Sequence, residues 1–517
     1  MKKIIITSLI ATALFASCSD SLLDLNNPNA LVAQNSWQTQ TDIESGLTGC
    51  YHTFYNSFYN SFNAFLISGQ SDEFYSQSPD ADLADYIMLK YSNYDQRWNI
   101  NSWNYLYQSI FRCNQVIVYA DEVEWSSETA KADIVAQARA IRGMGYYYLA
   151  MLWKKAPIVD WISAPADQPS ESTFEQLVAF VEADFKYAAE HLQESYPDEP
   201  GRVNMYFAYS FLGKLYMNSG QWSKARDAFA VVVNSGKFDL VANYRDNFKH
   251  TTENNIESIW EIQHSDENQT MGGYWGIPND GAVCCFASYR EKFLTASPYG
   301  WGDYSVYNWL VDMYKDELDK NGNYDTRLRD NIVYPELFSD FPGEVVYMKE
   351  TAWNSTNWSQ LSWCRKYTTD YYRADVTFYS PINARILRYG EILLSYAECL
   401  IEAEGESAIS KAAGYVNKIR ERVNLYPLDE SVHKDCLNNL NDFKKRLRIE
   451  REKEVCFEYD RFFDLRRWGL GTDTGFTNEV KQYCSKFASN FINGHEWLPI
   501  PLTEVSNNPN LTQNDSY

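Results

Sequence analysis

The sequence lacks the features that mark several functional classes. It holds only six histidines, and its ten cysteines form no Cys-x-x-Cys pair, so the usual spacing of a zinc site is absent. No phosphate-binding glycine loop and no nucleophile elbow accompany its acidic residues. Lysine and arginine number 46 against 69 aspartates and glutamates, and the net charge of −23 argues against binding to nucleic acid. We expect no cofactor, no metal ion and no nucleic-acid partner, whereas neutral or cationic ligands remain open.

Linkers and long hydrophobic runs are also scarce. After the N-terminus, no stretch is apolar enough to cross a membrane. The 517 residues could form about three average domains, but no Pro/Gly/Ser-rich segment divides them, so one large body over residues 18–517 is predicted. Aromatic residues are abundant instead. They make up 16% of the chain, more than a core alone usually demands, so we expect some rings at the surface.

The N-terminus resembles a lipoprotein signal peptide. Two lysines precede an apolar run over residues 4–15, and Ala16-Ser17 supply the small residues that cleavage requires before Cys18. We predict removal of residues 1–17, lipidation of Cys18 and attachment of the mature protein to a membrane. The alternatives are an ordinary secretory signal or a short transmembrane helix, but this run is shorter than the ~20 residues that span a bilayer. The other nine cysteines cannot all pair with one another, and buried free thiols are expected.

The clearest internal signal is a tetratricopeptide-like segment over residues 206–238. Small and large residues stand at the spacing of that repeat, namely Leu212, Gly213, Tyr216, Gly220, Ala225 and Phe229. The small residues let two antiparallel helices approach closely, and the large ones fill the space between them. Lys237 stands where the repeat often has proline. A buried helix pair is predicted here.

Further segments have helical periodicity. An apolar stripe runs from Phe174 to Leu192, and Ser172 with Glu175 predicts a capping box at its start. Other helices are predicted near residues 42–60, 98–121, 128–154, 384–404, 411–423 and 442–468. The predicted fold is therefore mainly α, a tetratricopeptide-like scaffold of helical pairs (an α-solenoid core) over about residues 40–243 and 384–468.

The residue composition and periodicity change between about residues 244 and 383. Gly, Asn, Asp, Trp and Tyr mix there without a steady period, which predicts long loops and short elements set on the helical frame. Binding residues usually lie in such loops. A closing segment over residues 469–517 follows the last predicted helix.

Five ordered motifs resemble those of the SusD/RagB family. They are Ser19-Asp20 with Leu22-Leu23-Asp24, then Arg139-Ala140 with Tyr147-Tyr148 and Pro157, then Arg388-Tyr389-Gly390-Glu391 with Ala397-Glu398, then Glu450-Arg451 with Asp464-Leu465-Arg466-Arg467-Trp468, and finally Leu498-Pro499-Ile500-Pro501 with Asn508-Pro509. The resemblance covers almost the whole chain. It implies the helical fold of that family.

The resemblance also implies a function. Members are surface lipoproteins that bind nutrients for SusC-like TonB-dependent transporters in Gram-negative outer membranes. We therefore expect a lipid-anchored protein at the cell exterior that captures oligosaccharide or polysaccharide and is not an enzyme. Two alternatives remain open. One is an adaptor that docks another protein on a concave tetratricopeptide-type face, and the other is capture of peptide rather than glycan.

The acidic residues of the C-terminal motifs could suggest glycoside hydrolysis, which uses two carboxylates. They alternate with arginines at helical spacing, however: Glu391, Glu398, Glu450, Glu454, Glu458 and Asp464 lie among Arg388, Arg420, Arg451, Arg461, Arg466 and Arg467. We expect these groups to form ion pairs, with Arg461 and Glu450 or Glu454 in a network that joins helices.

Aromatic rings outside any helical stripe are the candidates for binding. A sugar stacks its C–H face on Trp or Tyr and needs polar side chains at its edges. Two regions offer this mixture, and the predicted ligand-binding residues are Asp72, Arg97, Trp98 and Asn101 in the first and Trp275, Tyr289, Trp301, Tyr304, Trp353 and Trp358 in the second. Trp98, Trp275 and Trp301 are the expected stacking rings, because each has polar or glycine neighbours. For any single ring, packing under a loop is the simpler alternative.

Overall fold

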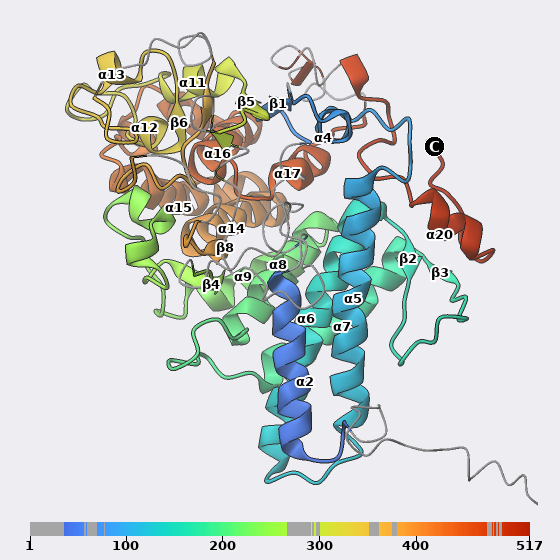
Figure 1. The fold of residues 1–517 in the computed structure, drawn as a ribbon. Helices are drawn as coiled ribbons and strands as arrows, with labels where there is room; N and C mark the ends of the chain where they lie inside the picture. The colour runs from blue at the N-terminus through green and yellow to red at the C-terminus, as the bar shows by residue number, and fades with distance from the viewer. Residues whose placement is uncertain are drawn as a thin grey trace, which may run out of the picture.

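The protein is largely helical (Figure 1). The computed structural model describes residues 36–55, 70–76, 78–265, 300–350, 361–374, 380–472 and 489–517, with a few isolated positions (58, 291, 294, 295, 478, 480, 481 and 484). The longer helices are α2 (Gln40–His52), α5 (Arg97–Tyr119), α6 (Glu128–Trp153), α7 (Phe174–His191), α8 (Met205–Asn218), α9 (Trp222–Val233), α14 (Tyr389–Glu404), α15 (Ile409–Arg422) and α16 (Leu440–Val455). Shorter ones are α4 (Ala81–Ile87), α11 (Asn308–Tyr314), α12 (Arg327–Asn331), α13 (Leu337–Asp340), α17 (Arg461–Arg467) and α20 (Leu502–Asn507).

The long helices pack as a continuous stack. Helices α5 to α9 each contact the next one in sequence, and α14 then packs on α9 and continues the stack through α15 and α16 (Figure 1). The chain segment between α9 and α14 is thus an insertion into a helical scaffold. The predicted mainly α fold with tetratricopeptide-like helical pairs is confirmed.

The tetratricopeptide-like pair is α8 and α9. The predicted core residues Leu212, Gly213, Tyr216, Ala225 and Phe229 are all buried. A Cβ atom added at Gly213 would lie 2.3 Å from the Phe229 ring, so only glycine lets the two helices approach this closely. The prediction of a buried helix pair is confirmed.

Helix α7 begins one residue later than the sequence suggests. The capping box consists of Thr173 and Gln176 rather than Ser172 and Glu175. Ser172 is unavailable because it lies in strand β3 (Glu171–Ser172), which pairs with β2 (Ala156–Pro157).

Two predicted C-terminal helices also need correction. Residues 384–388 form strand β8 (Ala384–Arg388), which pairs with β4 (Ser258–Ile262), so the helix starts only at Tyr389. The predicted helix over 442–468 is two helices, α16 and α17. Between them Phe457 and Tyr459 have φ angles of 68° and 81°, in the left-handed region that no α-helix can pass through.

The described parts of the insertion hold short elements. Besides α11, α12 and α13, they include β5 (Tyr304–Val306), β6 (Ile332–Val333) and β7 (Trp363–Cys364), with 3-10 turns at Tyr244–Phe248 and His250–Thr252. Strand β5 pairs with β1 (Phe74–Ser76), and β6 pairs with β7. The β1–β5 pair brings the segment after residue 70 against the insertion, while β4 and β8 join the two ends of the insertion.

Buried ion pairs join the insertion to the scaffold. Glu450 of α16 pairs with Arg420 of α15 and Arg446, and Glu454 pairs with Arg388, Arg422 and Arg327. Arg420 also donates two hydrogen bonds of 2.8 Å to Glu317. Most of these partners are far apart in sequence, so the network fixes tertiary structure rather than single helices.

The predicted ion pairs between helices are present, but the predicted partners of Arg461 are wrong. Arg461 pairs with Asp72 and Glu452, not with Glu450 or Glu454. The break between α16 and α17 turns Arg461 toward another part of the fold.

The thiol prediction is confirmed for the cysteines that the structure describes. They are buried and form no disulfide, and they are Cys50, Cys113, Cys364, Cys399, Cys436, Cys456 and Cys484. Cys18, Cys284 and Cys285 lie outside the described residues. Within the described part of the chain, no helix is both long and apolar enough to cross a bilayer.

Candidate ligand-binding site

Asp72 lies where the two predicted regions meet, but it is committed to an internal ion pair. Arg461 donates two hydrogen bonds of 2.7 Å, from Nε and Nη2, to its two carboxylate oxygens. Asp72 is only 3% exposed. A ligand hydroxyl would have to compete with this bidentate pair, and the role of Asp72 in ligand binding stays a prediction.

The start of α5 holds three more predicted residues. Trp98 is 8% exposed, and the Arg97 guanidinium lies 4.5 Å from its ring centroid. Arg97 also pairs with Asp80, the N-cap of α4. Trp98 is therefore buried and not an exposed stacking ring, while Arg97 and the half-buried Asn101 retain accessible surface.

The second region has one exposed ring among the described residues that were predicted to bind. Trp301 is 41% exposed and stands before Gly302, whose φ is 68°. Tyr304 is 1% exposed and packs edge-on against Phe74 with centroids 5.5 Å apart, and burial raises the pKa of its hydroxyl. Trp275, Tyr289, Trp353 and Trp358 lie outside the described residues. Trp301 thus has the exposure expected of a stacking platform, whereas Tyr304 is buried, and ligand binding by these residues stays a prediction.

A cavity of about 480 Å³ lies beside Asp72, between α11 and α16. We call it the α11–α16 cavity. Its lining residues are Asp72, Trp309, Asp312, Met313, Asp316, Lys445, Arg448, Ile449, Glu452, Arg461, Trp468 and Val480. This size, with apolar walls and a few polar groups, is typical of small-ligand sites. Sequence reasoning missed it because Trp468 lies in a motif assigned to ion pairs and Trp309 was not singled out.

The inner end of the α11–α16 cavity is polar and tightly paired. Arg461 lies between Asp72 and Glu452, and its Nη1 is 2.9 Å from Glu452 Oε2. Burial raises the pKa of Glu452 to about 7 and that of neighbouring Glu73 well above its usual range. Burial thus favours the protonated, neutral form of both carboxyl groups. In that form the inner end holds Asp72 and Arg461 as a balanced ion pair.

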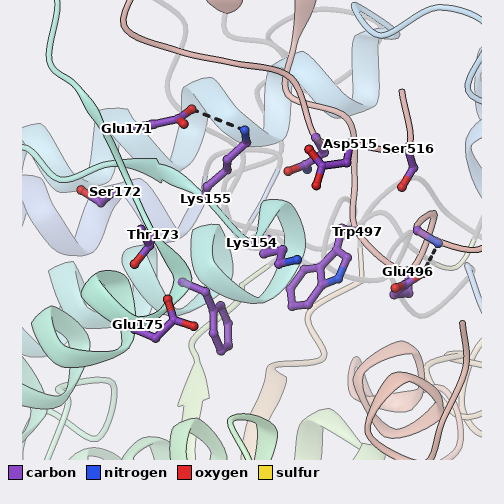
Figure 2. Close-up of a pocket in the computed structure, with 13 residues that line it drawn as sticks. Lys154, Lys155, Glu171, Ser172, Thr173, Glu175, Glu496, Trp497, Asp515 and Ser516 are labelled. Carbon is purple, nitrogen blue, oxygen red and sulfur yellow. Dashed lines mark hydrogen bonds and ion pairs between the residues drawn. The ribbon is translucent and has the colours of Figure 1, made fainter. Parts of the chain in front are cut away.

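A second concave region lies between the C-terminal end of α6 and the C-terminal segment (Figure 2). Its volume is about 300 Å³, and Lys155 reaches across it toward Glu171. Trp497 is flanked by Arg466, 4.0 Å from its ring centroid, and by Lys154 at 5.7 Å. Cations occupy the approaches to this ring, so it is a poorer stacking surface for sugar than Trp301.

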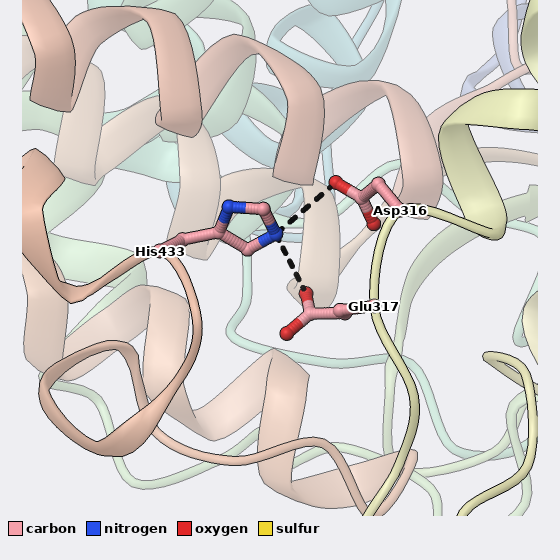
Figure 3. A group of neighbouring side chains, drawn as sticks. All are labelled: Asp316, Glu317 and His433. Atoms are coloured by element: carbon pink, nitrogen blue, oxygen red, sulfur yellow. Dashed lines mark ion pairs between the residues drawn. The ribbon is translucent and has the colours of Figure 1, made fainter.

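Asp316, Glu317 and His433 form a cluster that could suggest a metal site (Figure 3). His433 Nε2 lies 3.3 Å from Asp316 and 3.8 Å from Glu317. The carboxylates are already held by cations: Arg446 and Lys453 pair with Asp316 at 2.7 and 2.6 Å, and Arg420 pairs with Glu317 at 2.8 Å. Burial opposes ionisation of Asp316, but the hydrogen bond with His433 and the charges of Lys453 and Arg446 outweigh burial and lower its pKa. A metal ion would meet three positive side chains, so these residues do not fit one.

Taken together, the fold and the site define a class of protein. A stack of antiparallel helices carries a loop-rich insertion with an exposed tryptophan and a ligand-sized cavity, and ion pairs occupy the acidic residues of the C-terminal motifs. This is a helical-repeat scaffold built for binding.

Comparison with known families agrees with this description. Residues 256–517 match the model described as the SusD family, and residues 21–217 match a model described as starch-binding associating with outer membrane. The chain belongs to the SusD family. The resemblance seen in the sequence motifs is thereby confirmed.

Individual relatives are distant but match over nearly their full length. SusD-like protein P25 of Formosa agariphila is 25% identical, with 97% of this chain and 96% of the relative covered. A SusD superfamily protein from Bacteroides vulgatus superposes with a TM-score of 0.79 at 24% identity, covering 93% of this chain and all of the other. Surface glycan-binding protein A from Bacteroides thetaiotaomicron, solved with laminarihexaose, gives 0.72 at 20% identity, covering 92% and 100%. At these identities the solved structures support the fold alone.

Proposed function

We propose that this protein is a cell-surface lipoprotein that captures oligosaccharide or polysaccharide and delivers it to a SusC-like TonB-dependent transporter. The observation that carries the proposal is membership of the SusD family, with a second match to a model described as starch-binding associating with outer membrane. A structural neighbour with the same fold was solved with laminarihexaose, so a protein of this fold can hold a glycan. Lipidation of Cys18 would hold the protein at the outer membrane.

The exposed ring of Trp301 supports glycan capture at the insertion. The residue is 41% exposed, and the flanking Gly300 and Gly302 carry no side chains beside it. Stacking on such a ring is worth about 1–3 kcal/mol, by analogy with bases stacked on aromatic side chains. Trp275, Trp353 and Trp358 remain predicted contributors in the same part of the chain.

The test is a glycan screen of the mature chain without its lipid, followed by calorimetry. We expect Trp301→Ala to weaken binding of the best glycan by about 10-fold or more and to leave the fold intact. Trp161→Ala is the matched control, because Trp161 is 40% exposed but lies outside the insertion. Equal affinity of parent and Trp301→Ala would exclude this ring. No binding to any glycan, together with co-purification of another protein, would favour the adaptor alternative.

Anchoring and delivery need a separate measurement in cells. Replacement of Cys18 by Ala should move the protein from the membrane fraction to the soluble fraction and end co-purification with a transporter of the outer membrane. Equal membrane recovery of the variant would refute lipidation of Cys18.

A further inference from the structure

Helices α2 and α5 pack against each other in an antiparallel arrangement, and two hydrogen bonds fix their register. Just after α2, the Thr53 hydroxyl lies 2.9 Å from the Ser109 hydroxyl of α5. One turn earlier, the Gly49 carbonyl accepts a hydrogen bond of 2.9 Å from Arg112 Nη1. As the residue number rises along α2, the number of the facing residue on α5 therefore falls.

Cys50 and Cys113 meet in this interface. In this register, position 50 lies level with positions 112 and 113, and the Cys113 thiol is in hydrogen-bonding contact with Cys50. Both residues are 0% exposed, and both are thiols in the structure. One turn earlier in α2, a Cβ atom added at Gly46 would lie 3.3 Å from Val116 Cγ2, so the helices are close together here. Two cysteines in such contact can be joined with little movement of the backbone.

We propose that Cys50 and Cys113 form a disulfide bond in the exported protein, which ties α2 to α5. The proposal rests on the proposed function, because disulfides form and persist in oxidising compartments outside the cytoplasm. Helix α2 is the first helix that the structure describes after the predicted lipid anchor at Cys18. The bond would hold this helix on the stack when the anchor is pulled. It would also close the chain segment that carries β1 and α4, which restricts the unfolded chain.

The bond forms by thiol–disulfide exchange with an oxidant that is itself a disulfide, either of a thiol oxidase or of glutathione. One cysteine thiolate attacks a sulfur of the oxidant, and the S–S bond of the oxidant breaks. The second cysteine thiolate then attacks the mixed disulfide and releases the other sulfur of the oxidant. Two electrons and two protons pass from the cysteine pair to the oxidant, which leaves as two thiols.

Burial sets the time at which this exchange can occur. Burial raises the pKa of the Cys113 thiol well above its usual range, so little thiolate is present once the helices have packed. Neither residue is exposed to an oxidant in the folded protein. We therefore place the oxidation during folding after export, before α2 closes on α5.

The test maps disulfides in the full chain, expressed with its own signal peptide in a Gram-negative host. Protein from the membrane fraction is alkylated under denaturing conditions and digested, and the peptides are measured by mass spectrometry before and after reduction. We expect a pair of peptides joined through Cys50 and Cys113, which reduction separates. The pair should be absent from Cys50→Ala. Cys399→Ala is the matched control and should retain it, because Cys399 is equally buried but lies in α14.

The bond should also change thermal stability without any change of sequence. The denatured full chain is refolded once with oxidised glutathione and once with excess reductant. We expect the oxidised preparation to melt about 2–4 °C higher than the reduced one. This difference should vanish in Cys113→Ala and persist in Cys399→Ala. Equal melting temperatures of the two parent preparations would contradict the proposed tie between α2 and α5.

Failure of this proposal can be told apart from failure of the proposed function. Reduced Cys50 and Cys113 in membrane-bound protein would overturn the disulfide, whether or not the protein binds glycan. Absence of the protein from the membrane fraction would instead refute its anchoring, and the refolded chain then decides about the cysteine pair. In that sample, joined peptides support the bond and their absence overturns it.

Discussion

At the scale of single residues, Gly213 sets how closely α8 and α9 pack. We expect Gly213→Ala to destabilise the protein by about 1–3 kcal/mol, because the added Cβ would lie 2.3 Å from the buried Phe229 ring. Urea denaturation measures the change. Gly414→Ala in α15 is the control: its Cβ meets nothing within 4 Å, so it should be neutral or stabilise by up to about 1 kcal/mol. Similar effects of the two variants would show that the α8–α9 packing is described incorrectly.

Single residues also show where sequence reasoning stops. Gly213 and Phe229 could be predicted because their roles depend on repeat spacing over 16 positions. Asp72 could not, since its partner Arg461 is 389 residues away in sequence. Glycine and polar neighbours suggested exposure equally for Trp98 and Trp301, but only the tertiary structure decides that Trp98 is 8% exposed and Trp301 41% exposed.

At the scale of elements, Arg388 joins β8 and α16 at the base of the insertion. It is 1% exposed and pairs with Glu257, Glu454 and Glu458. We expect Arg388→Met to cost about 3–5 kcal/mol, because it removes a buried cation that three buried carboxylates share. Arg226→Met, which removes a surface pair with Asp227 and Glu404, should cost less than about 1 kcal/mol. Denaturant midpoints compare the two, and equal losses would contradict the role of Arg388.

Elements were predictable wherever local signals decided their limits. Helices α5, α6 and α15 lie close to their predicted ranges, and the start of α7 differs by one residue. The α16–α17 break was missed because it depends on left-handed residues at 457 and 459 that carry ordinary side chains rather than glycine. The α11–α16 cavity was missed for a related reason: each wall has plain helical spacing, and only the fold shows that the two faces oppose each other.

At the scale of the whole molecule, buried carboxyl groups make stability depend on pH in two opposite directions. Burial raises the pKa of Glu391 to about 8. Burial also opposes ionisation of Glu398, but the charge of Arg467 outweighs it and lowers the pKa of Glu398 to about 2. The folded protein thus binds more protons than the unfolded chain at Glu391 between about pH 4.5 and 8, so this contribution to stability is lost as the pH rises. The Glu398 contribution is present above about pH 4.5 and is lost only in acid.

We therefore expect the stability advantage of the parent over Glu391→Gln to shrink between pH 5 and 8, with a slope of at most about 1.4 kcal/mol per pH unit. The glutamine variant mimics the protonated side chain and keeps its size. The advantage over Glu398→Gln should stay constant over the same range. Urea titrations at several pH values measure both, and parallel curves for parent and Glu391→Gln would show that Glu391 is ionised in the folded protein.

The pairing of β4 with β8 has a consequence for how this protein can diversify. The two strands bring the ends of residues 263–383 together, so a change of length between them need not move the base of the insertion. Closing a flexible loop of twice the length costs only about 0.6 kcal/mol more. Relatives of this sequence could therefore lengthen or shorten loops of the insertion that do not contact the helical stack at small energetic expense, and bind other ligands while the stack stays the same.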